Sequence, residues 1–344
     1  MRALALALTL LSLPALSAAH ENPQRQLKQE AASWPEQLSY DIPLRLLQIP
    51  VSFPVEYTAE VRRQITDYLQ LGRRETEKML ARTSLYFPII EHYLQEFNLP
   101  DELKYIPLLE SRLIPTAESP VGALGLWQFM PATAGHYQLQ IDEYVDERMN
   151  PYQATEAALR MLAGLHRDFG DWSLALAAYN CGPGRVRSAI RQTGCHNFWD
   201  IEHLLPRQTQ RYLPALIATI YVANYFRLHG LSPDPKKLHQ PFQVFKVQHS
   251  LNLADIARHC KVTRRQLHRL NPGFLQDFIP HSGRGRYLIL PEKALPDFQK
   301  YIIKESRKSK ESFAIAVLNS HHYQPAAKGA RDRVKKGIRP KADI

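Results

Sequence analysis

Glu110 is the residue of this sequence whose surroundings most favour acid–base chemistry. It follows two leucines in the stretch LLESRLIPTAESPVGALGLWQFMPATAG, residues 108–135. Apolar neighbours remove water from a carboxyl group, which raises its pKa and keeps a proton available near neutral pH. A single glutamate at a helix end is more often a solvated charge. The stretch therefore predicts a general acid at the rim of an apolar cleft, with a solvated glutamate as the alternative.

Other kinds of catalytic site find no support in the sequence. No pair of carboxylates has the spacing of a two-carboxylate glycosidase, and no expected helix carries two histidines at metal-ligand spacing. A Gly-x-Ser-x-Gly elbow and a glycine loop for phosphate are also missing. Neither a metal nor a cofactor is expected.

Glu110 begins the first of four short motifs that follow one another along the chain. They are Glu110-Ser111, then Ser119-x-x-Gly122-Ala123-x-Gly125-Leu126-Trp127-Gln128-Phe129-Met130, then Ala178-Tyr179-Asn180-x-Gly182, and finally Pro206-x-x-Thr209-x-x-Tyr212. Together they resemble the soluble lytic transglycosylase domain over most of residues 57–231, and Trp127 resembles the membrane-bound type D branch.

The resemblance implies a lysozyme-like helical domain that cleaves the β-1,4 bond between N-acetylmuramic acid and N-acetylglucosamine in peptidoglycan. Glu110 matches the single catalytic glutamate of the family, which first donates a proton and then accepts one. The product would carry a 1,6-anhydro end. A hydrolytic muramidase on the same fold and a noncatalytic peptidoglycan-binding scaffold are the alternatives.

The resemblance also implies a set of substrate-binding residues. They are Ser119, Gln128, Met130, Tyr179 and Asn180. The amide of Gln128 could hydrogen-bond a sugar acetamido or hydroxyl group, and Met130 could supply an adaptable apolar floor. The phenol of Tyr179 could donate a hydrogen bond to Glu110. Asn180 either caps a helix or binds sugar.

Several neighbouring residues are expected to support the site. Gly122 and Gly125 would let backbone approach a sugar closely, or would serve a close helix crossing instead. Asp146 and Arg148 should form a structural ion pair, and Tyr212 should support the cleft without contacting sugar.

The resemblance contains one departure from the family pattern. Where the family often has a glutamate before the threonine of Pro-x-x-Thr-x-x-Tyr, this chain has Gln208. A neighbouring carboxylate that helped to keep the acid protonated would be missing. Burial and hydrogen bonding would then have to do so alone, which leaves the pH optimum open.

The sequence before the helical domain predicts export. Arg2, an apolar run interrupted by Pro14, and small residues at Ser17 and Ala19 are typical of a signal peptide cleaved after residue 19. No cysteine follows the run, so the expected location is the periplasm. Residues 20–57 are rich in proline and aromatic residues and are expected to be extended.

The helical domain is expected over residues 58–231, which makes the chain mostly α. Apolar residues recur at helical spacing from Thr58 onward, and Asn150 and Pro151 should begin a helix that continues to about Gly170. Another helical pattern ends at Gly230, and a breaker cluster, SPDPKK, then marks a linker.

A small α+β module is expected over residues 242–292. FQVFKV and YLILP alternate like strands, and LADIARHC and TRRQLHRLN have helical spacing. The order resembles a LysM module, although His249-Ser250-Leu251-Asn252 replaces the usual Gly-Asp-Thr turn and leaves glycan binding open. The basic tail, residues 293–344, is expected to be largely disordered.

The net charge and the cysteines limit the kinds of partner and the cellular compartment that the sequence supports. The formal net charge of +11 suits acidic polymers of the cell wall or an anionic lipid surface, so peripheral association with the wall or the outer membrane is left open. No nucleic acid is expected, and protein partners are unknown. Cys181 and Cys195 could pair or stay free, whereas Cys260 should be buried.

Overall fold

The computed structural model of the chain describes residues 36–235, 241–309 and 315–318. The chain divides into two compact units, Met1–Leu44 and Arg45–Ile344. The expected signal peptide, residues 1–19, lies outside the described residues. Of the helices in the described part of the chain, none combines the length and the apolar character that a membrane crossing requires.

The segment expected to be extended contains a helix, so this expectation is wrong for part of residues 20–57. Helix α2 (Glu36–Leu46) continues through Pro43. Ile42 and Leu46 are four residues apart and buried, which is the spacing of one helix face. The prolines of the segment made this short helical periodicity hard to detect in the sequence.

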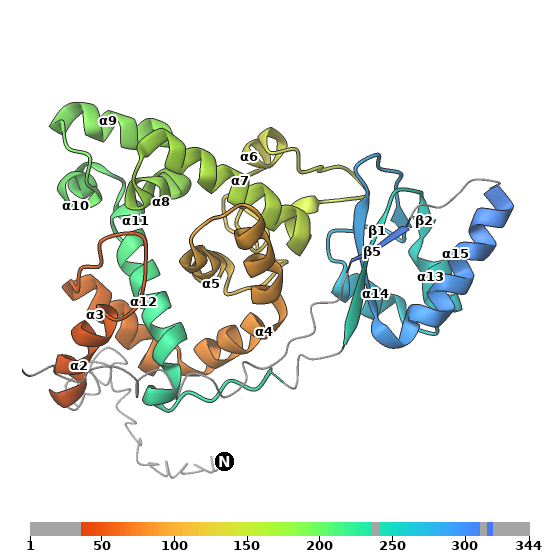
Figure 1. Cartoon of the computed structure of the whole chain (residues 1–344), viewed down its shortest axis with the longest axis horizontal. Helices are drawn as coiled ribbons and strands as arrows, with labels where there is room; N and C mark the ends of the chain where they lie inside the picture. Colours follow the sequence, from red (N-terminus) through yellow and green to blue (C-terminus); the bar gives the residue numbers. More distant parts are fainter. Residues whose placement is uncertain (1–35, 236–240, 310–314, 319–344) are drawn as a thin grey trace, which may run out of the picture. The chain divides into compact units, whose positions relative to one another are not determined.

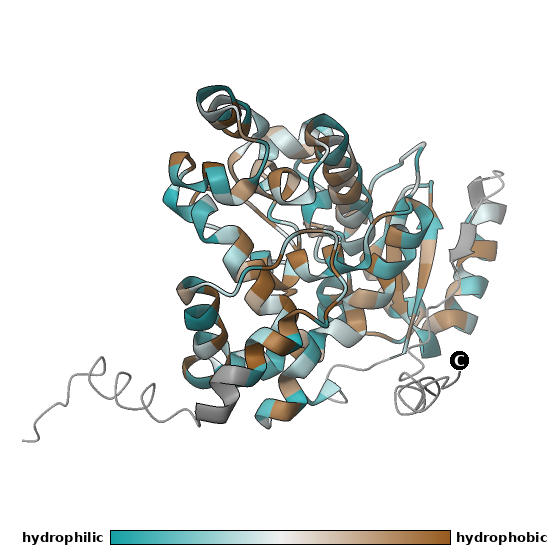
Figure 2. Cartoon of the chain, turned by 60° about the vertical axis from the view of Figure 1, so that its left-hand side comes forward, coloured by the Kyte–Doolittle hydropathy of each residue, from teal (hydrophilic) through white to brown (hydrophobic). Residues whose placement is uncertain are grey.

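Ten helices of the second unit form the expected helical region (Figure 1). A π-helical turn, Asp67–Leu71, joins the first two of them. They are α3 (Ala59–Thr66), α4 (Arg73–Glu96), α5 (Ile106–Ser111), α6 (Pro131–His136), α7 (Pro151–Phe169), α8 (Trp172–Cys181), α9 (Pro183–Thr193), α10 (Phe198–Ile201), α11 (Arg207–Gln210) and α12 (Tyr212–Tyr225). Most of them carry both apolar and polar residues along their length (Figure 2).

Local signals in the sequence set the ends of α7. The side chain of Asn150 accepts hydrogen bonds from the backbone N–H groups of Tyr152 and Gln153, and Pro151 occupies the first turn. Gly170 ends the helix in the left-handed conformation, with φ of 70°. The predicted helix is confirmed at both ends.

Helix α12 links the elements that carry the motifs. It is buried on nearly all sides, from Tyr212 to Val222, and packs against both α5 and α8. Glu110 lies on α5 and Tyr179 on α8, while Tyr212 is the first residue of α12. These three side chains therefore meet where the three helices pack together.

The α+β module follows the helical region, as expected. Strands β1 (Phe242–Val247), β4 (Arg286–Pro291) and β5 (Ile315–Leu318) form an antiparallel sheet in the order β4-β1-β5, and β2 (Leu251–Asn252) pairs with β3 (Phe278–Ile279). Val244 is the partner of Ile289 on one side and of Leu318 on the other. The helices are α13 (Leu253–His259) and α14 (Arg264–Leu270), grouped with the strands in Figure 1.

The module continues past residue 292, so the expectation of a disordered tail is wrong for its first part. Residues Leu295–Ser309 form helix α15, and Phe298 and Tyr301 belong to the buried core of the module. The three-residue spacing of Phe298 and Tyr301 brings both to one helix face. β5 comes from an apolar island in the same tail.

The module contacts the helical region through a loop before α7. The backbone N–H of Leu275 donates to the carbonyl of Tyr144 at 2.8 Å, and Val145 is part of the core of the module. The carboxylate of Glu147 and the guanidinium of Arg286 form an ion pair at 2.6 Å, with only 4% and 2% of the side chains exposed. Within the unit that contains both, the module is packed against the helical region.

Candidate active site

Glu110 occupies the last turn of a helix that is held at both ends. Pro107 is in the first turn of α5, and Arg112 ends the helix in the left-handed conformation. The hydroxyl of Ser111 donates to the carbonyls of Pro107 and Leu126, at 3.0 and 2.9 Å. The second bond ties the Glu110 turn to the glycine-containing loop that follows it.

The buried face of α5 continues that of the segment before it. Leu103 and Ile106 are both buried. Leu109 is only partly buried, while Leu108 is fully buried. The helix proper begins at Ile106 after a 3₁₀ segment, and the change of helical period shifts the face that points inward.

The carboxyl group of Glu110 is placed against a tyrosine. The hydroxyl of Tyr212 donates to Oε1 of Glu110 at 2.6 Å. The side chain is only partly exposed, and burial raises its pKa to about 7, whereas the hydrogen bond from Tyr212 lowers it. No second carboxylate contributes to this shift of the Glu110 pKa. At neutral pH both the protonated and the ionised form of Glu110 are therefore well populated.

The phenol of Tyr179 does not donate to Glu110, which corrects the expected hydrogen bond. Its hydroxyl donates to the carbonyl of Trp127 at 2.6 Å. Burial and the nearby Glu110 carboxylate raise the pKa of Tyr179 well above its ordinary value, so the two groups are neighbours without a hydrogen bond. A sequence cannot show which of two motif tyrosines reaches the acid.

Gln128 holds the loop together. Its backbone is in the left-handed region, with φ of 52°, and its amide nitrogen donates to the carbonyls of Ala117 and Gly125, both at 2.9 Å. Both amide N–H donors are thus used within the protein. Its side-chain oxygen accepts no hydrogen bond from the described residues, and the side chain is partly exposed.

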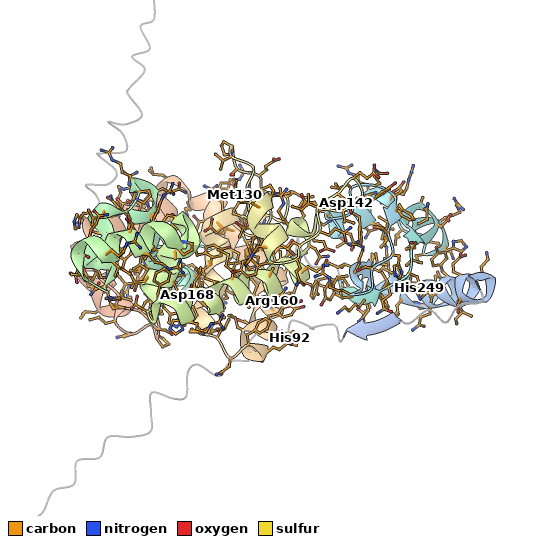
Figure 3. All side chains as sticks on the ribbon, turned by 90° about the horizontal axis from the view of Figure 1, so that it is seen from above. His92, Met130, Asp142, Arg160, Asp168 and His249 are labelled. Atoms are coloured by element: carbon orange, nitrogen blue, oxygen red, sulfur yellow. The ribbon has the colours of Figure 1, made fainter. Side chains whose placement is uncertain are left out.

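Ser119 and Met130 lie at the two ends of this loop. The hydroxyl oxygen of Ser119 accepts a hydrogen bond from the backbone N–H of Ala123 at 2.9 Å. Met130, labelled in Figure 3, is 41% exposed. Within the described residues neither side chain is hydrogen-bonded to Glu110.

Asn180 is oriented by a residue that the site prediction left out. The buried hydroxyl of Thr209 donates to Oδ1 of Asn180 at 2.8 Å. This bond points the amide oxygen inward, and the amide nitrogen has no acceptor among the described residues. Thr209 and Tyr212 belong to one sequence motif, whose fixed three-residue spacing was the signal for both.

The loop rests on Arg148. Its guanidinium pairs with Asp146 at 2.7 Å, which confirms the expected ion pair, and donates to the carbonyls of Gly122 and Phe129 at 2.9 and 3.2 Å. A Cβ on Gly125 would lie 1.9 Å from the carbonyl oxygen of Arg148. Gly125 therefore allows a close approach of two backbone segments, as in the second of the two alternatives for this glycine.

The other residues of interest form no hydrogen bond with Glu110 within the described part of the chain. Gln208 is exposed on α11, while its neighbour Thr209 is buried. Cys181 and Cys195 are free, so the pairing that the sequence left open is not formed, and Cys260 is buried as predicted. In the described part of the chain no group of three or more histidine, cysteine or acidic residues could hold a metal ion.

Two protein families match parts of the chain. The family described as "Transglycosylase SLT domain" matches residues 87–201, and the family described as "Lytic transglycosylase MltD, LysM-like domain" matches residues 242–302. The first range contains Glu110 and all five expected substrate-binding residues. The second extends into α15, in agreement with the packed core of the module.

Two individual relatives are described as lytic murein transglycosylases. The chain is 27% identical over 271 residues to the membrane-bound lytic murein transglycosylase D of Escherichia coli strain K12, which covers 76% of this chain and 59% of that protein. It is 38% identical over 109 residues to the soluble lytic murein transglycosylase of the same strain, covering 30% of this chain and 17% of that one. The chain thus spans little more than half of the first relative.

A solved structure is also similar over part of the chain. The crystal structure of the 70-kDa soluble lytic transglycosylase of Escherichia coli matches with a TM-score of 0.36 and 28% identity, and covers 41% of this chain and 24% of that one. The two matched families and the two relatives are all described as transglycosylases or parts of them. The chain therefore carries an SLT domain over residues 87–201 and a LysM-like domain over residues 242–302, and it is similar in sequence to lytic murein transglycosylases.

Proposed function

We propose that this chain cleaves the β-1,4 bond between N-acetylmuramic acid and N-acetylglucosamine in peptidoglycan without consuming water. The observation that carries the proposal is the surroundings of Glu110. Burial raises its pKa to about 7 and its partner is a phenol, so one group can hold and release a proton near neutral pH.

The proposed reaction uses Glu110 twice. The protonated carboxyl gives its proton to the glycosidic oxygen, which leaves as the 4-hydroxyl of N-acetylglucosamine. The resulting carboxylate accepts the proton of the muramoyl C6 hydroxyl, whose oxygen attacks the anomeric carbon of the same sugar. A 1,6-anhydro ring forms, and Glu110 is protonated again. The N-acetyl group of the substrate would stabilise the intermediate, so a second protein carboxylate is not needed.

Tyr212 acts in this scheme as a positioning residue. Its hydrogen bond is stronger to the ionised than to the protonated carboxyl, because the acceptor then carries charge. The bond therefore favours release of the proton and fixes Oε1 in space. Tyr179, which donates to the backbone at Trp127, would hold the loop beside the reacting group.

The remaining polar atoms suit an N-acetylated sugar. Gln128 offers an unused acceptor for an N–H or O–H group, and Asn180 offers N–H donors for a carbonyl or hydroxyl oxygen. Ser119 and the exposed Met130 would bind at the edge of the same loop. These are proposed substrate contacts, and no cofactor takes part in the scheme.

The proposed place of action is the periplasm. It is supported by the sequence of residues 1–19 and by the similarity to a lytic murein transglycosylase described as membrane-bound. Glycan strands of peptidoglycan are the proposed partner, and the net charge of +11 would favour contact with an acidic wall.

Mass analysis of products from purified sacculi tests the proposal. Wild-type protein should release fragments with 1,6-anhydromuramic ends, and Glu110→Gln should release about 10³-fold less. Reducing ends would show a hydrolytic muramidase. Binding of both proteins to sacculi with no product from either would show a noncatalytic scaffold. Either result contradicts the proposed reaction.

A further inference from the structure

A second concave site lies between the helical region and the LysM-like module, away from the residues assigned to catalysis. It is a cavity of about 320 Å³. From the helical region it is lined by residues that include Tyr137, Glu147, Glu156 and Arg160, and from the module by Lys246, Arg284, Gly285 and Tyr287. Its volume is at the lower end of the roughly 300–1,000 Å³ common for small-ligand pockets.

The lining carries more positive than negative charge. Three cations, Arg160, Lys246 and Arg284, face two carboxylates, Glu147 and Glu156. Glu147 pairs with Arg286 at 2.6 Å within the buried junction, and more loosely with Arg284 at 3.7 Å. With Arg286 included, four cations face two carboxylates, which leaves an excess of two positive charges for a ligand. Arg160, labelled in Figure 3, lies 3.6 Å from Glu156, which is only a loose ion pair.

Lys246 is held in place before any ligand arrives. Gly285 has φ of 77°, and a Cβ at this position would lie 2.8 Å from Cγ of Lys246, so the lysine stem packs directly over the glycine. The ammonium nitrogen lies 5.6 Å from the ring centroid of Tyr287. No carboxylate of the described residues pairs with it. A fixed cation without a counter-ion lowers the entropic cost of binding an acidic group.

We propose that this cavity binds the carboxylate-bearing peptide stems of peptidoglycan. The inference rests on the proposed function, since it concerns the same polymer. The sugar backbone offers mainly hydroxyl and acetamido groups, whereas the stems concentrate carboxylates and amino groups on short chains. Lys246, Arg284 and Arg160 would take the carboxylates, and Glu156 would take an amino group. The module would then recognise peptide beside the strand that the helical region cleaves.

Calorimetric titration of the full chain with the tripeptide L-Ala-γ-D-Glu-diaminopimelic acid tests this site. Wild-type protein should bind it in a salt-sensitive manner. Lys246→Met keeps the apolar stem over Gly285 and removes the charge, so binding should weaken about ten-fold. Lys300→Met removes a charge from an exposed lysine of α15 outside the cavity and should bind as wild type. Absence of binding, or equal loss in both variants, would overturn the proposal.

Two further measurements complete the test. One distinguishes binding of the peptide stem from binding of other anions, and the other distinguishes the proposed binding site from the proposed cleavage reaction. Equal affinity for the tripeptide with amidated carboxyl groups, or for inorganic phosphate, would contradict peptide recognition. Wild-type protein should have a higher kcat/KM on stem-bearing than on peptide-free glycan strands, and Lys246→Met should bring this ratio close to one. If no strand is cleaved, the proposed function fails, while the calorimetric result still decides the binding site.

Discussion

Glu110 and Glu147 are two glutamates of the helical region with opposite kinds of neighbours. Glu147 pairs with the guanidinium of Arg286 at 2.6 Å, and both side chains are almost fully buried. Glu110 has a phenol, that of Tyr212, at the same distance, and no cation of the described residues forms an ion pair with it. Burial raises the pKa of Glu110 to about 7.

The difference shows that the partner, more than burial, decides what a shielded carboxylate can do. A guanidinium that pairs with a buried carboxylate offsets the hydration that both groups lose, so Glu147 serves as an anchor between the helical region and the module. A phenol stabilises the ionised form less, so Glu110 can still be protonated near pH 7. Only the second arrangement suits proton transfer.

The largest effect is expected for Glu110→Gln. Loss of the only proposed proton donor and acceptor should lower kcat by about 10³-fold on sacculi, with little change in substrate binding. Glu143→Gln, which changes an exposed glutamate, is the matched control and should keep wild-type turnover. Product release within ten-fold of wild type by Glu110→Gln would remove Glu110 from the reaction.

The same variant should alter stability in a pH-dependent way. The folded-state pKa of Glu110, about 7, lies above the ordinary value of 4.5, so the folded protein binds the extra proton between these values. The free energy of unfolding contributed by this group therefore falls as pH rises from about 4.5 to 7. Denaturation at several pH values should show this fall in wild type and not in Glu110→Gln.

The next effect concerns the anchor. Arg286→Met leaves the buried Glu147 with only the more distant Arg284, at 3.7 Å, and should lower the free energy of unfolding by about 3 kcal/mol. The double variant Glu147→Met/Arg286→Met should lose less than the sum of the two single variants, because neither charge is left alone. Chemical denaturation measures all four proteins. Additive losses would show that the pair does not act as a unit.

The loop between the two glutamates offers a matched pair of glycines. Both have positive φ, 84° at Gly122 and 90° at Gly125, but only at Gly125 would a Cβ meet backbone, at 1.9 Å from the carbonyl oxygen of Arg148. Gly122→Ala should cost about 1 kcal/mol through backbone strain, and Gly125→Ala about 3 kcal/mol because of the clash. Equal costs would mean that the loop does not rest on Arg148 as described.

A smaller effect is expected at Tyr212. Its hydrogen bond lowers the pKa of Glu110, so Tyr212→Phe should raise that pKa further. Because the reaction starts from the protonated acid, the alkaline limb of the pH–rate profile should move to higher pH, with a loss of about ten-fold in kcat. Tyr179→Phe is the comparison, since its hydroxyl bonds to backbone. A limb that moves only in Tyr179→Phe would reverse the two assignments.

The smallest effect is expected at Gln208. Its side chain is exposed, and the Glu110 carboxyl is bonded to Tyr212 instead. A charge at an exposed position is screened by water and salt, so Gln208→Glu should leave the pH–rate profile unchanged. A clear alkaline shift would show that the two positions are coupled.

Much of the fold followed from local patterns, whereas the partners of the site did not. Asn150, Pro151 and Gly170 predicted α7 correctly because a cap acts on residues next to it in the chain. The spacing of Phe298 and Tyr301 in α15 was overshadowed by the surrounding lysines and arginines, although the two aromatic rings gain from burial in the module.

The site itself was predicted as a set of motifs, and its hydrogen bonds only appeared with the packing of α5, α8 and α12. Tyr179 and Tyr212 are both motif tyrosines near Glu110, and helix packing alone decides that Tyr212 is its hydrogen-bond donor. In the same way the sequence could not show that both amide N–H donors of Gln128 are used by backbone carbonyls.

The most direct measurement is a titration of Glu110 itself, by carbon-13 NMR of protein labelled at the side-chain carboxyl carbons of glutamate, with Glu110→Gln to assign the signal. We expect one signal, missing from the variant, to titrate with a midpoint near pH 7. A midpoint near 4.5, the ordinary value for glutamate, would mean that Glu110 is ionised at neutral pH and is not poised to donate a proton.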